Sequence, residues 1–315
     1  MLHGNPEHGI ATEFKLRPAE CPVCGSRESR TLFSDRNRRE GLEISSSYCK
    51  CSTCSTIFLN PTLDEASFSG FDEVYGASKT ARPRPGLTKL LGGINNNSIH
   101  GWLHRLPAGN GSGRKLLDVG CSSGEKLRTF RKRGFEVFGV DMAADAIKKA
   151  NERFAGGFTC GRLEDAHYQD DFFDFIRIDN TLEHIQKPRE LLKEARRILR
   201  PGGSLFVYVP NGESLSMRLI KGYSINSWIP FHVVLYSPET LRNLLSKAGF
   251  ADVRTFSHTP PALLLSSASQ LLGREKAIDL GLAGQILSAS VLPESLVMSL
   301  LPCGEEVVGI AKKSL

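Results

Sequence analysis

The stretch 115–141 begins Lys-Leu-Leu-Asp-Val-Gly-Cys-Ser-Ser-Gly and ends Glu-Val-Phe-Gly-Val-Asp. Its first residues form a short apolar run that stops at a glycine turn, the pattern of a buried parallel strand. Gly120 and Gly124 bracket this turn, where the missing side chain lets a ligand approach the backbone amides. A charged segment, 125–133, then predicts a helix, and a second apolar strand follows it and ends at Asp141. The order strand, turn, helix and strand predicts an α/β fold with a parallel sheet.

The carboxylate of Asp141 is placed to accept both hydroxyls of a ribose, as in the nucleoside-binding half of a Rossmann-like sheet. A dinucleotide site would need the spacing G-x-G-x-x-G, whereas this turn reads Gly120-x-x-x-Gly124 with Asp118 just before it. The turn resembles the first motif of class I S-adenosylmethionine-dependent methyltransferases, Asp/Glu-x-Gly-x-Gly-x-Gly, and departs from it at Ser122. The resemblance implies a seven-stranded, mostly parallel sheet with helices on both faces.

Two C-x-x-C pairs lie near the N-terminus, separated by 26 residues. Four thiolates in this arrangement can hold a tetrahedral Zn²⁺, and a fully occupied ligand set indicates a structural rather than a catalytic metal. The alternative is a group of unrelated thiols, and Cys49 is a surplus thiol that could compete as a ligand. The predicted metal ligands are Cys21, Cys24, Cys51 and Cys54.

This cysteine segment, followed by Ile57-Phe-Leu-Asn-Pro61, resembles the zinc-knuckle preface of many bacterial methyltransferases. Those proteins act on sugars, polysaccharide precursors or other small metabolites, so the resemblance implies a small-molecule acceptor. It extends from Cys21 to Lys312. Within the spacer between the cysteine pairs, two short strands are predicted at 31–33 and 42–44.

The resemblance places the S-adenosylmethionine cofactor at the carboxyl ends of the strands. It implies that Asp118 meets the methionine amino end, that Leu163 borders the adenine, and that Glu164 or Asp165 accepts from its exocyclic amine. An acidic solvated loop is the alternative for either of these two carboxylates. The cofactor-binding residues predicted on this basis are Asp118, Gly120, Ser122, Gly124, Asp141, Leu163, Glu164 and Asn180.

Two histidines are candidates for a catalytic base. His184 ends a Leu-Glu-His sequence in the loop that leaves the fourth predicted strand, 172–178, and this loop faces the reactive methyl. His232 lies in an aromatic segment, 211–236, at the same rim of the sheet. A hydroxyl acceptor would need such a base, since the methyl donor is already activated and the protein mainly aligns the reactants. A structural role is the alternative for each histidine.

The composition shifts predict a chain of four parts. Residues 1–20 form a disordered tail, 21–62 the zinc-knuckle segment, 63–112 a connector with helices that cover the cofactor, and 113–315 the methyltransferase domain. A helical insertion, at about 260–302, is rich in leucine and serine. We expect it to pack on the core or to contact a membrane surface or another protein.

The 315-residue chain has a formal net charge of +6 and a pI near 8.9, which permits an anionic partner without requiring nucleic acid. The sequence shows no signal peptide and no apolar run of transmembrane length, so we expect a cytoplasmic protein with reduced cysteines. Two alternatives to a small-molecule methyltransferase are an RNA-base methyltransferase with a cysteine knuckle and a non-catalytic scaffold that keeps the fold. The sequence does not define the oligomeric state.

Overall fold

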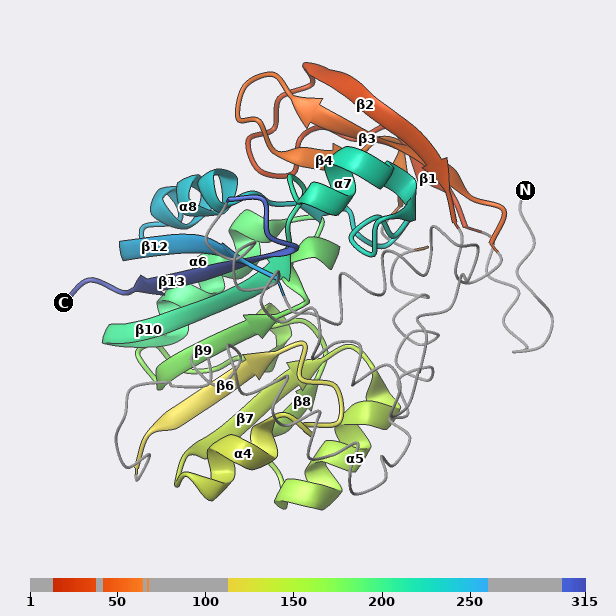
Figure 1. Ribbon diagram of the computed structural model, residues 1–315. Helices are drawn as coiled ribbons and strands as arrows, with labels where there is room; N and C mark the ends of the chain where they lie inside the picture. Colours follow the sequence, from red (N-terminus) through yellow and green to blue (C-terminus); the bar gives the residue numbers. More distant parts are fainter. Residues whose placement is uncertain (1–13, 38–41, 65–66, 68–112, 260–301) are drawn as a thin grey trace, which may run out of the picture.

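A seven-stranded sheet forms the centre of the computed structural model, which describes residues 14–37, 42–64, 67, 113–259 and 302–315. Its strand order is β12-β13-β10-β9-β6-β7-β8, and β13 runs antiparallel to both of its neighbours while β6 to β10 pair in parallel (Figure 1). This confirms the predicted Rossmann-like α/β class. The strands are β6 (Lys115–Val119), β7 (Glu136–Asp141), β8 (Phe158–Cys160), β9 (Phe173–Asp179), β10 (Leu199–Pro210), β12 (Ala251–His258) and β13 (Glu306–Lys312).

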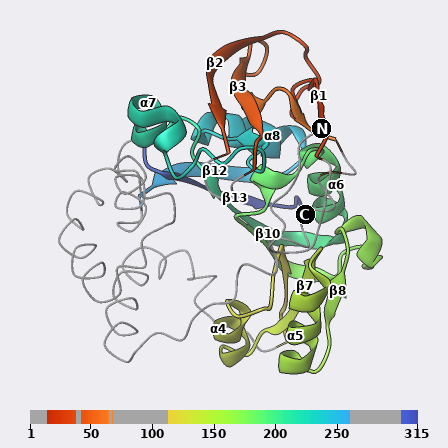
Figure 2. The ribbon, with the colours of Figure 1, turned by 90° about the vertical axis from the view of Figure 1, so that its right-hand side faces the viewer.

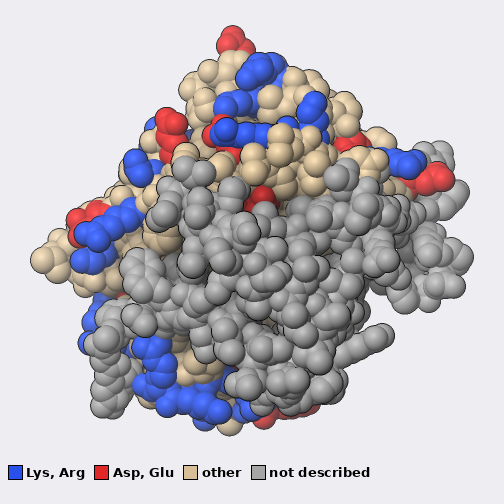
Figure 3. Space-filling model, in the orientation of Figure 1, with Lys and Arg blue, Asp and Glu red and all other residues tan. Residues whose placement is uncertain are grey.

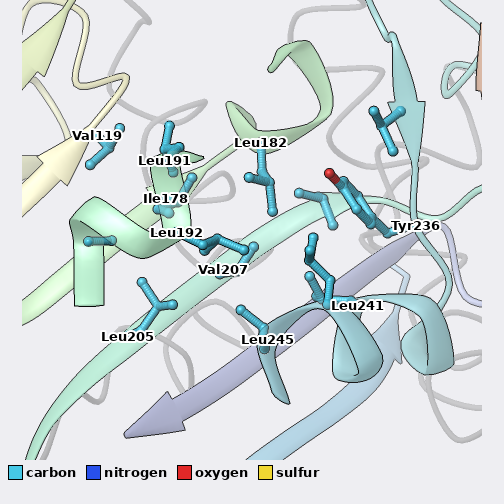
Figure 4. Close-up of a cluster of buried hydrophobic side chains, with 14 of the residues drawn as sticks. Val119, Ile178, Leu182, Leu191, Leu192, Leu205, Val207, Tyr236, Leu241 and Leu245 are labelled. Atoms are coloured by element: carbon cyan, nitrogen blue, oxygen red, sulfur yellow. The ribbon is translucent and has the colours of Figure 1, made fainter. Parts of the chain in front are cut away.

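Helices cover both faces of this sheet, and the alternation of side chains along the strands shows which helix covers which face. On β6, Leu116 packs in one cluster with Phe130 of α4 (Leu127–Lys132), together with α5 (Ala144–Phe154). The next residue, Leu117, belongs to the opposite cluster with Leu192 of α6 (Pro188–Ile198) and with α8 (Pro238–Lys247). Figure 2 shows the main sheet between α4 and α5 below and α8 above, and Figure 4 shows part of the second cluster.

Two of the helices, α6 and α8, begin where the sequence supplies start signals. Pro188 occupies the first turn of α6, where its missing amide proton costs no hydrogen bond. At α8 the Ser237 hydroxyl accepts from the Thr240 amide, and the Thr240 hydroxyl accepts from the Ser237 amide in return. A first-turn proline and a capping box therefore mark the starts of the two helices that pack on the face nearest to the cysteine segment.

The cysteine segment folds as part of a second, antiparallel sheet, which we call the small sheet. Its order is β11-β4-β3-β2, and β11 comes from residues 234–235. One predicted strand is misplaced: the segment 42–44 leads into the strand β3 rather than forming it. The Ile44 amide donates to the Leu42 carbonyl at 2.8 Å, so these residues form a tight local turn, and three serines, which give no apolar pattern, open β3. The strands are β2 (Ser29–Arg36), β3 (Ser45–Cys51), β4 (Ile57–Leu59) and β11 (Val234–Leu235).

A two-stranded ladder joins the start of the described chain to the end of the cysteine segment. Strand β1 (Leu16–Arg17) pairs antiparallel with β5 (Thr62–Leu63). Ordered backbone therefore begins within the residues 1–20 that the sequence predicts to be a tail.

Residues 211–236 connect β10 to α8 by way of the small sheet (Figure 1). They include the helix α7 (Leu215–Ile220), the 3-10 helix η4 (Lys221–Tyr223) and finally β11. A backbone bridge between Asn211 and Tyr236 closes this excursion where it leaves and rejoins the main sheet. The excursion therefore belongs to both sheets.

The predicted cofactor-covering helices of the connector and the helical insertion at about 260–302 lie almost wholly outside the described residues. Among the helices that are described, none combines the length and the apolar character that a membrane crossing requires.

Candidate functional site

The turn after β6 approaches the loop after β9 so closely that a side chain would not fit. Gly120 has φ +77°, and a Cβ placed there would lie 2.0 Å from the hydroxyl oxygen of Thr181. Gly124, with φ +70°, would meet Phe154 at 2.8 Å. Ser122, at the position where the motif has glycine, takes φ +48° and so adopts the left-handed conformation that glycine favours. The turn keeps the backbone shape of the motif despite the serine.

Asp141, at the end of β7, ties this turn to the next loop. Its Oδ2 accepts from the Ser122 amide at 2.7 Å, and its Oδ1 accepts from the Ala143 amide at 2.9 Å. A carboxylate oxygen has two acceptor positions, so each oxygen retains one for a further donor. The arrangement can therefore accept two neighbouring hydroxyls beside the glycine turn.

Asp118 is part of an ion network that the sequence analysis did not anticipate. Nη1 of Arg177 lies 2.8 Å and 2.9 Å from the two oxygens of Asp118, which is buried. The same guanidinium contacts Asp179, and Nζ of Lys126 lies 2.5 Å from Oδ2 of Asp179. Two carboxylates and two cations thus balance at the carboxyl edge of β6 and β9. The available signal was an arginine within the apolar strand Phe-Asp-Phe-Ile-Arg-Ile.

The predicted adenine side lies at the end of β8. Leu163 is buried, and Glu164 begins the short 3-10 helix η2 (Glu164–Ala166) with an exposed side chain. One oxygen of Asp165 accepts from the Arg162 amide at 3.2 Å, which gives Asp165 a local structural role. Of the two carboxylates that the sequence left open, Glu164 is therefore the one that we retain as the acceptor candidate.

Asn180 lies where β9 ends, with φ +52°. Its backbone amide donates to the Tyr208 carbonyl at 2.8 Å, and its side-chain Nδ2 donates to Oδ1 of Asp179 at 3.1 Å. The structure therefore places Asn180 next to the ion network at the edge where the glycine turn lies.

The two candidate base histidines come together, with 5.0 Å between their ring centroids. His184 ends the 3-10 helix η3 (Leu182–His184), and its Nδ1 is 2.9 Å from the Phe231 carbonyl. Nδ1 of His232 is 2.8 Å from the Asn226 carbonyl. A carbonyl oxygen only accepts, so in each neutral ring Nδ1 carries the proton and Nε2 is the basic nitrogen.

Glu183 completes this group, and the sequence analysis did not select it although it lies within the Leu-Glu-His sequence. Its side chain is buried, and Oε1 lies 3.7 Å from Nε2 of His184. One potential ligand or proton-accepting atom from each of Glu183, His184 and His232 lies within 4.8 Å of the others. Trp228 packs edge-on against both imidazole rings. The group is thus a buried carboxylate beside two oriented imidazoles.

A separate cluster is formed by Cys21, Cys24, Cys51 and Cys54, whose sulfurs all lie within 4.8 Å of one another. The Cys21–Cys54 and Cys24–Cys51 sulfur pairs are each 3.5 Å apart. Zn–S bonds of about 2.3 Å in a tetrahedron would separate the sulfurs by about 3.8 Å, so the donor set fits zinc. Burial raises the pKa of the Cys51 thiol, but hydrogen bonds, above all those from the backbone amides of Cys54 and Thr53, lower this pKa to about 7. Cys49 points elsewhere: its sulfur contacts the Thr31 hydroxyl at 3.7 Å.

The known proteins that this chain resembles include methyltransferases. Residues 94–255, just over half of the chain, match a family described as a methyltransferase domain. A ubiquinone biosynthesis O-methyltransferase of Idiomarina loihiensis is 28% identical over 153 residues, which cover 45% of this chain and 63% of that protein. An uncharacterised 37.1 kDa protein from transposon Tn4556 of Streptomyces fradiae is 33% identical over 195 residues, or 58% of this chain and 54% of that protein. The chain thus spans less than two thirds of each of these relatives.

A chain of the solved Haloferax volcanii complex that contains the Trm112 methyltransferase activator is similar in fold. It has 18% sequence identity and a TM-score of 0.52, and the match covers 78% of this chain and 98% of that one. This likeness shows a similar fold. The family match over residues 94–255 leads to one conclusion: the chain belongs to the methyltransferase-domain family.

Proposed function

We propose that this protein transfers a methyl group from S-adenosylmethionine to a hydroxyl of a small molecule, with sugars and polysaccharide precursors as the first acceptors to test. The observation that carries the proposal is the placement of Asp141. Its two oxygens hold the glycine turn and the following loop, and they keep acceptor capacity for a ribose. Family membership and the naming of a similar protein as an O-methyltransferase support the reaction type.

The residues at the carboxyl edge suit this cofactor. The bound cofactor would supply an activated methyl group on a sulfonium. Gly120, Ser122 and Gly124 allow its close approach to the backbone, and Asp141 accepts from the ribose hydroxyls. Asp118 would face the methionine end as an ion-paired carboxylate rather than as a free one, because Arg177 already contacts both of its oxygens.

The histidine pair supplies the base that a hydroxyl acceptor requires. Nδ1 of each ring donates to a backbone carbonyl, so Nε2 is left as the proton acceptor in both His184 and His232. A base held within hydrogen-bond reach of the hydroxyl typically contributes a factor of about 10² to 10⁴ in rate. Glu183, beside Nε2 of His184, would stabilise the imidazolium that forms after proton transfer.

We further propose that the four-cysteine cluster holds a structural Zn²⁺. The cluster contributes four sulfur ligands, which fill a tetrahedral coordination shell and leave no position for a substrate. The metal would therefore contribute to folding of the small sheet rather than to chemistry.

The decisive test of cofactor binding is calorimetric titration with S-adenosylhomocysteine. We expect Asp141→Ala to weaken binding by at least tenfold, because a hydrogen bond to a charged group contributes about 1.5–3 kcal/mol and about 1.4 kcal/mol corresponds to a factor of ten. Asp145→Ala is the matched control, since Asp145 is an exposed carboxylate in the first turn of α5. Equal affinity of the two variants would overturn the assignment of the ribose site.

Transfer to an acceptor is tested separately with radiolabelled cofactor and panels of hydroxylated small molecules and RNA. Labelling of a small-molecule hydroxyl supports the proposal. Labelling confined to RNA would favour the nucleic-acid alternative. On the face shown in Figure 3, Lys and Arg side chains lie in separate groups at the small sheet, on the left near α8 and the C-terminus, and at the bottom in the region of α4. They do not form one continuous patch among the residues coloured there.

A further inference from the structure

The segment 226–235, which we call the histidine loop, sets the orientation of both candidate bases. It carries His232 itself. It also supplies the two carbonyls that accept from the imidazoles, Asn226 for His232 and Phe231 for His184. Any shift of this loop would therefore move both hydrogen bonds that fix the tautomers.

The C-terminal end of the histidine loop forms β11, which is a strand of the small sheet rather than of the main sheet. β11 pairs antiparallel with β4, where Val234 lies opposite Phe58 and Leu235 opposite Ile57. The Leu59 amide also donates to the Val233 carbonyl at 3.0 Å. The residue directly after His232 is thus already held by the backbone of the small sheet.

Two side chains of the small sheet hold the other end of the loop. The Tyr48 hydroxyl, from β3, accepts from the Trp228 amide at 3.2 Å. Nδ2 of Asn37, just after β2, donates to the Ile229 carbonyl at 2.7 Å. Tyr48 and Asn37 are both buried, so neither contact competes with bulk water. Three strands of the small sheet, or their ends, therefore fix the loop on both sides of His232.

The four cysteines organise these same strands. Cys51 ends β3, three residues beyond Tyr48, and its amide donates to the Thr56 carbonyl just before β4 begins. Cys54 lies in the turn between β3 and β4. A metal bound by these sulfurs would hold together the hairpin that contacts the histidine loop.

We propose that the small sheet, which is organised by the four cysteines, positions His184 and His232 through its contacts with the histidine loop. This inference rests on the function proposed above for the two histidines. The cofactor side is supported differently, since the contacts of Asp141 with Ser122 and Ala143 lie within loops of the main sheet. Loosening the small sheet should therefore disturb acceptor activation and leave cofactor binding intact.

The test uses the full-length, zinc-loaded protein with Asn37→Ala, Tyr48→Phe and the double variant. Ser34→Ala is the control, because Ser34 lies on the same sheet and its side-chain hydroxyl is hydrogen-bonded only to the Ser47 hydroxyl among the contacts described. Imidazole tautomers are measured by long-range ¹H–¹⁵N NMR. Zinc content, S-adenosylhomocysteine affinity and turnover are measured on the same samples.

We expect the Nε2–H tautomer to gain population at His184 and His232 in the double variant and to stay at the wild-type level in Ser34→Ala. We expect kcat to fall about tenfold, as part of the general-base factor is lost, with zinc content and cofactor affinity within twofold of wild type. Tyr48→Phe alone removes one oxygen from a buried ring, so it serves as the test if Asn37→Ala fails to fold.

Unchanged tautomers in a folded double variant would overturn the inference, and so would a loss of cofactor affinity as large as the loss of kcat. The tautomers are read without cofactor or acceptor. A wild-type protein that binds no S-adenosylhomocysteine would therefore refute the proposed function, while the tautomer result would still decide whether the small sheet positions the histidines.

Discussion

Replacing Gly120 with alanine tests the geometry of the cofactor turn. The structure gives this position two distinct constraints. Its φ of +77° is one that residues with a side chain rarely adopt, and the added Cβ would overlap Thr181, with 2.0 Å to Oγ1, 2.9 Å to Cγ2 and 3.0 Å to Cβ. Thr181 cannot turn away without cost, because its hydroxyl donates to the Val119 carbonyl at 3.2 Å. We therefore expect the two costs to add.

The magnitude follows from these two terms. A left-handed conformation costs a residue with a side chain about 1–2 kcal/mol. Forcing a methyl group into a filled space costs about 1–3 kcal/mol more. Gly120→Ala should therefore destabilise the protein by roughly 2–5 kcal/mol. Gly113 isolates the first term, since its φ is +75° and a Cβ there would meet no atom of the described residues within 4 Å.

Urea denaturation of wild type, Gly120→Ala and Gly113→Ala gives the comparison, with S-adenosylhomocysteine affinity as the second measurement. We expect Gly113→Ala to cost about 1–2 kcal/mol and to keep cofactor affinity. Thr181→Ala combined with Gly120→Ala should recover about 1–2 kcal/mol, because it removes the two nearest atoms. Equal destabilisation by the two glycine variants, or no coupling with Thr181, would refute the close approach of the turn to the β9 loop.

Two further predictions concern the metal and a buried acid. Cys24→Ser should lose zinc, measured by elemental analysis, and should have a melting temperature lower by roughly 10 °C or more. Cys49→Ser should keep the metal. Loss of zinc in both variants would make Cys49 a ligand. Burial raises the pKa of Glu306 well above its ordinary value, an effect that Lys126 opposes and Glu183 reinforces. Because the folded state then holds a proton that the unfolded chain releases above about pH 4.5, stability falls as pH rises towards the folded-state pKa. Glu306→Gln should therefore gain stability over wild type as pH rises from 5 to 8 in urea denaturation, and a constant difference would contradict this.

The main sheet could be predicted because its signals are local. An apolar run such as 115–119, followed by a glycine turn and a helix, indicates a buried strand, and the helix predicted at 125–133 contains α4, Leu127–Lys132. The small sheet was harder to predict. β3 opens with three serines, and β11, the partner strand of β4, lies more than 170 residues further along the chain. No local pattern indicates such a pairing.

The same contrast applies to the candidate site. The position of Asp141 at the end of β7 could be predicted from sequence, and the carboxyl ends of parallel strands form the edge where ligands bind in such sheets. The salt bridge of Arg177 with Asp118 could not, since it depends on the register between β6 and β9, which places side by side two residues that are 59 positions apart in sequence. The pairing of His184 with His232 depends on still more, namely a loop that leaves the main sheet and joins another. Residues whose positions follow from topology were therefore predictable, whereas partners brought together by strand register or by packing between the two sheets required the structure.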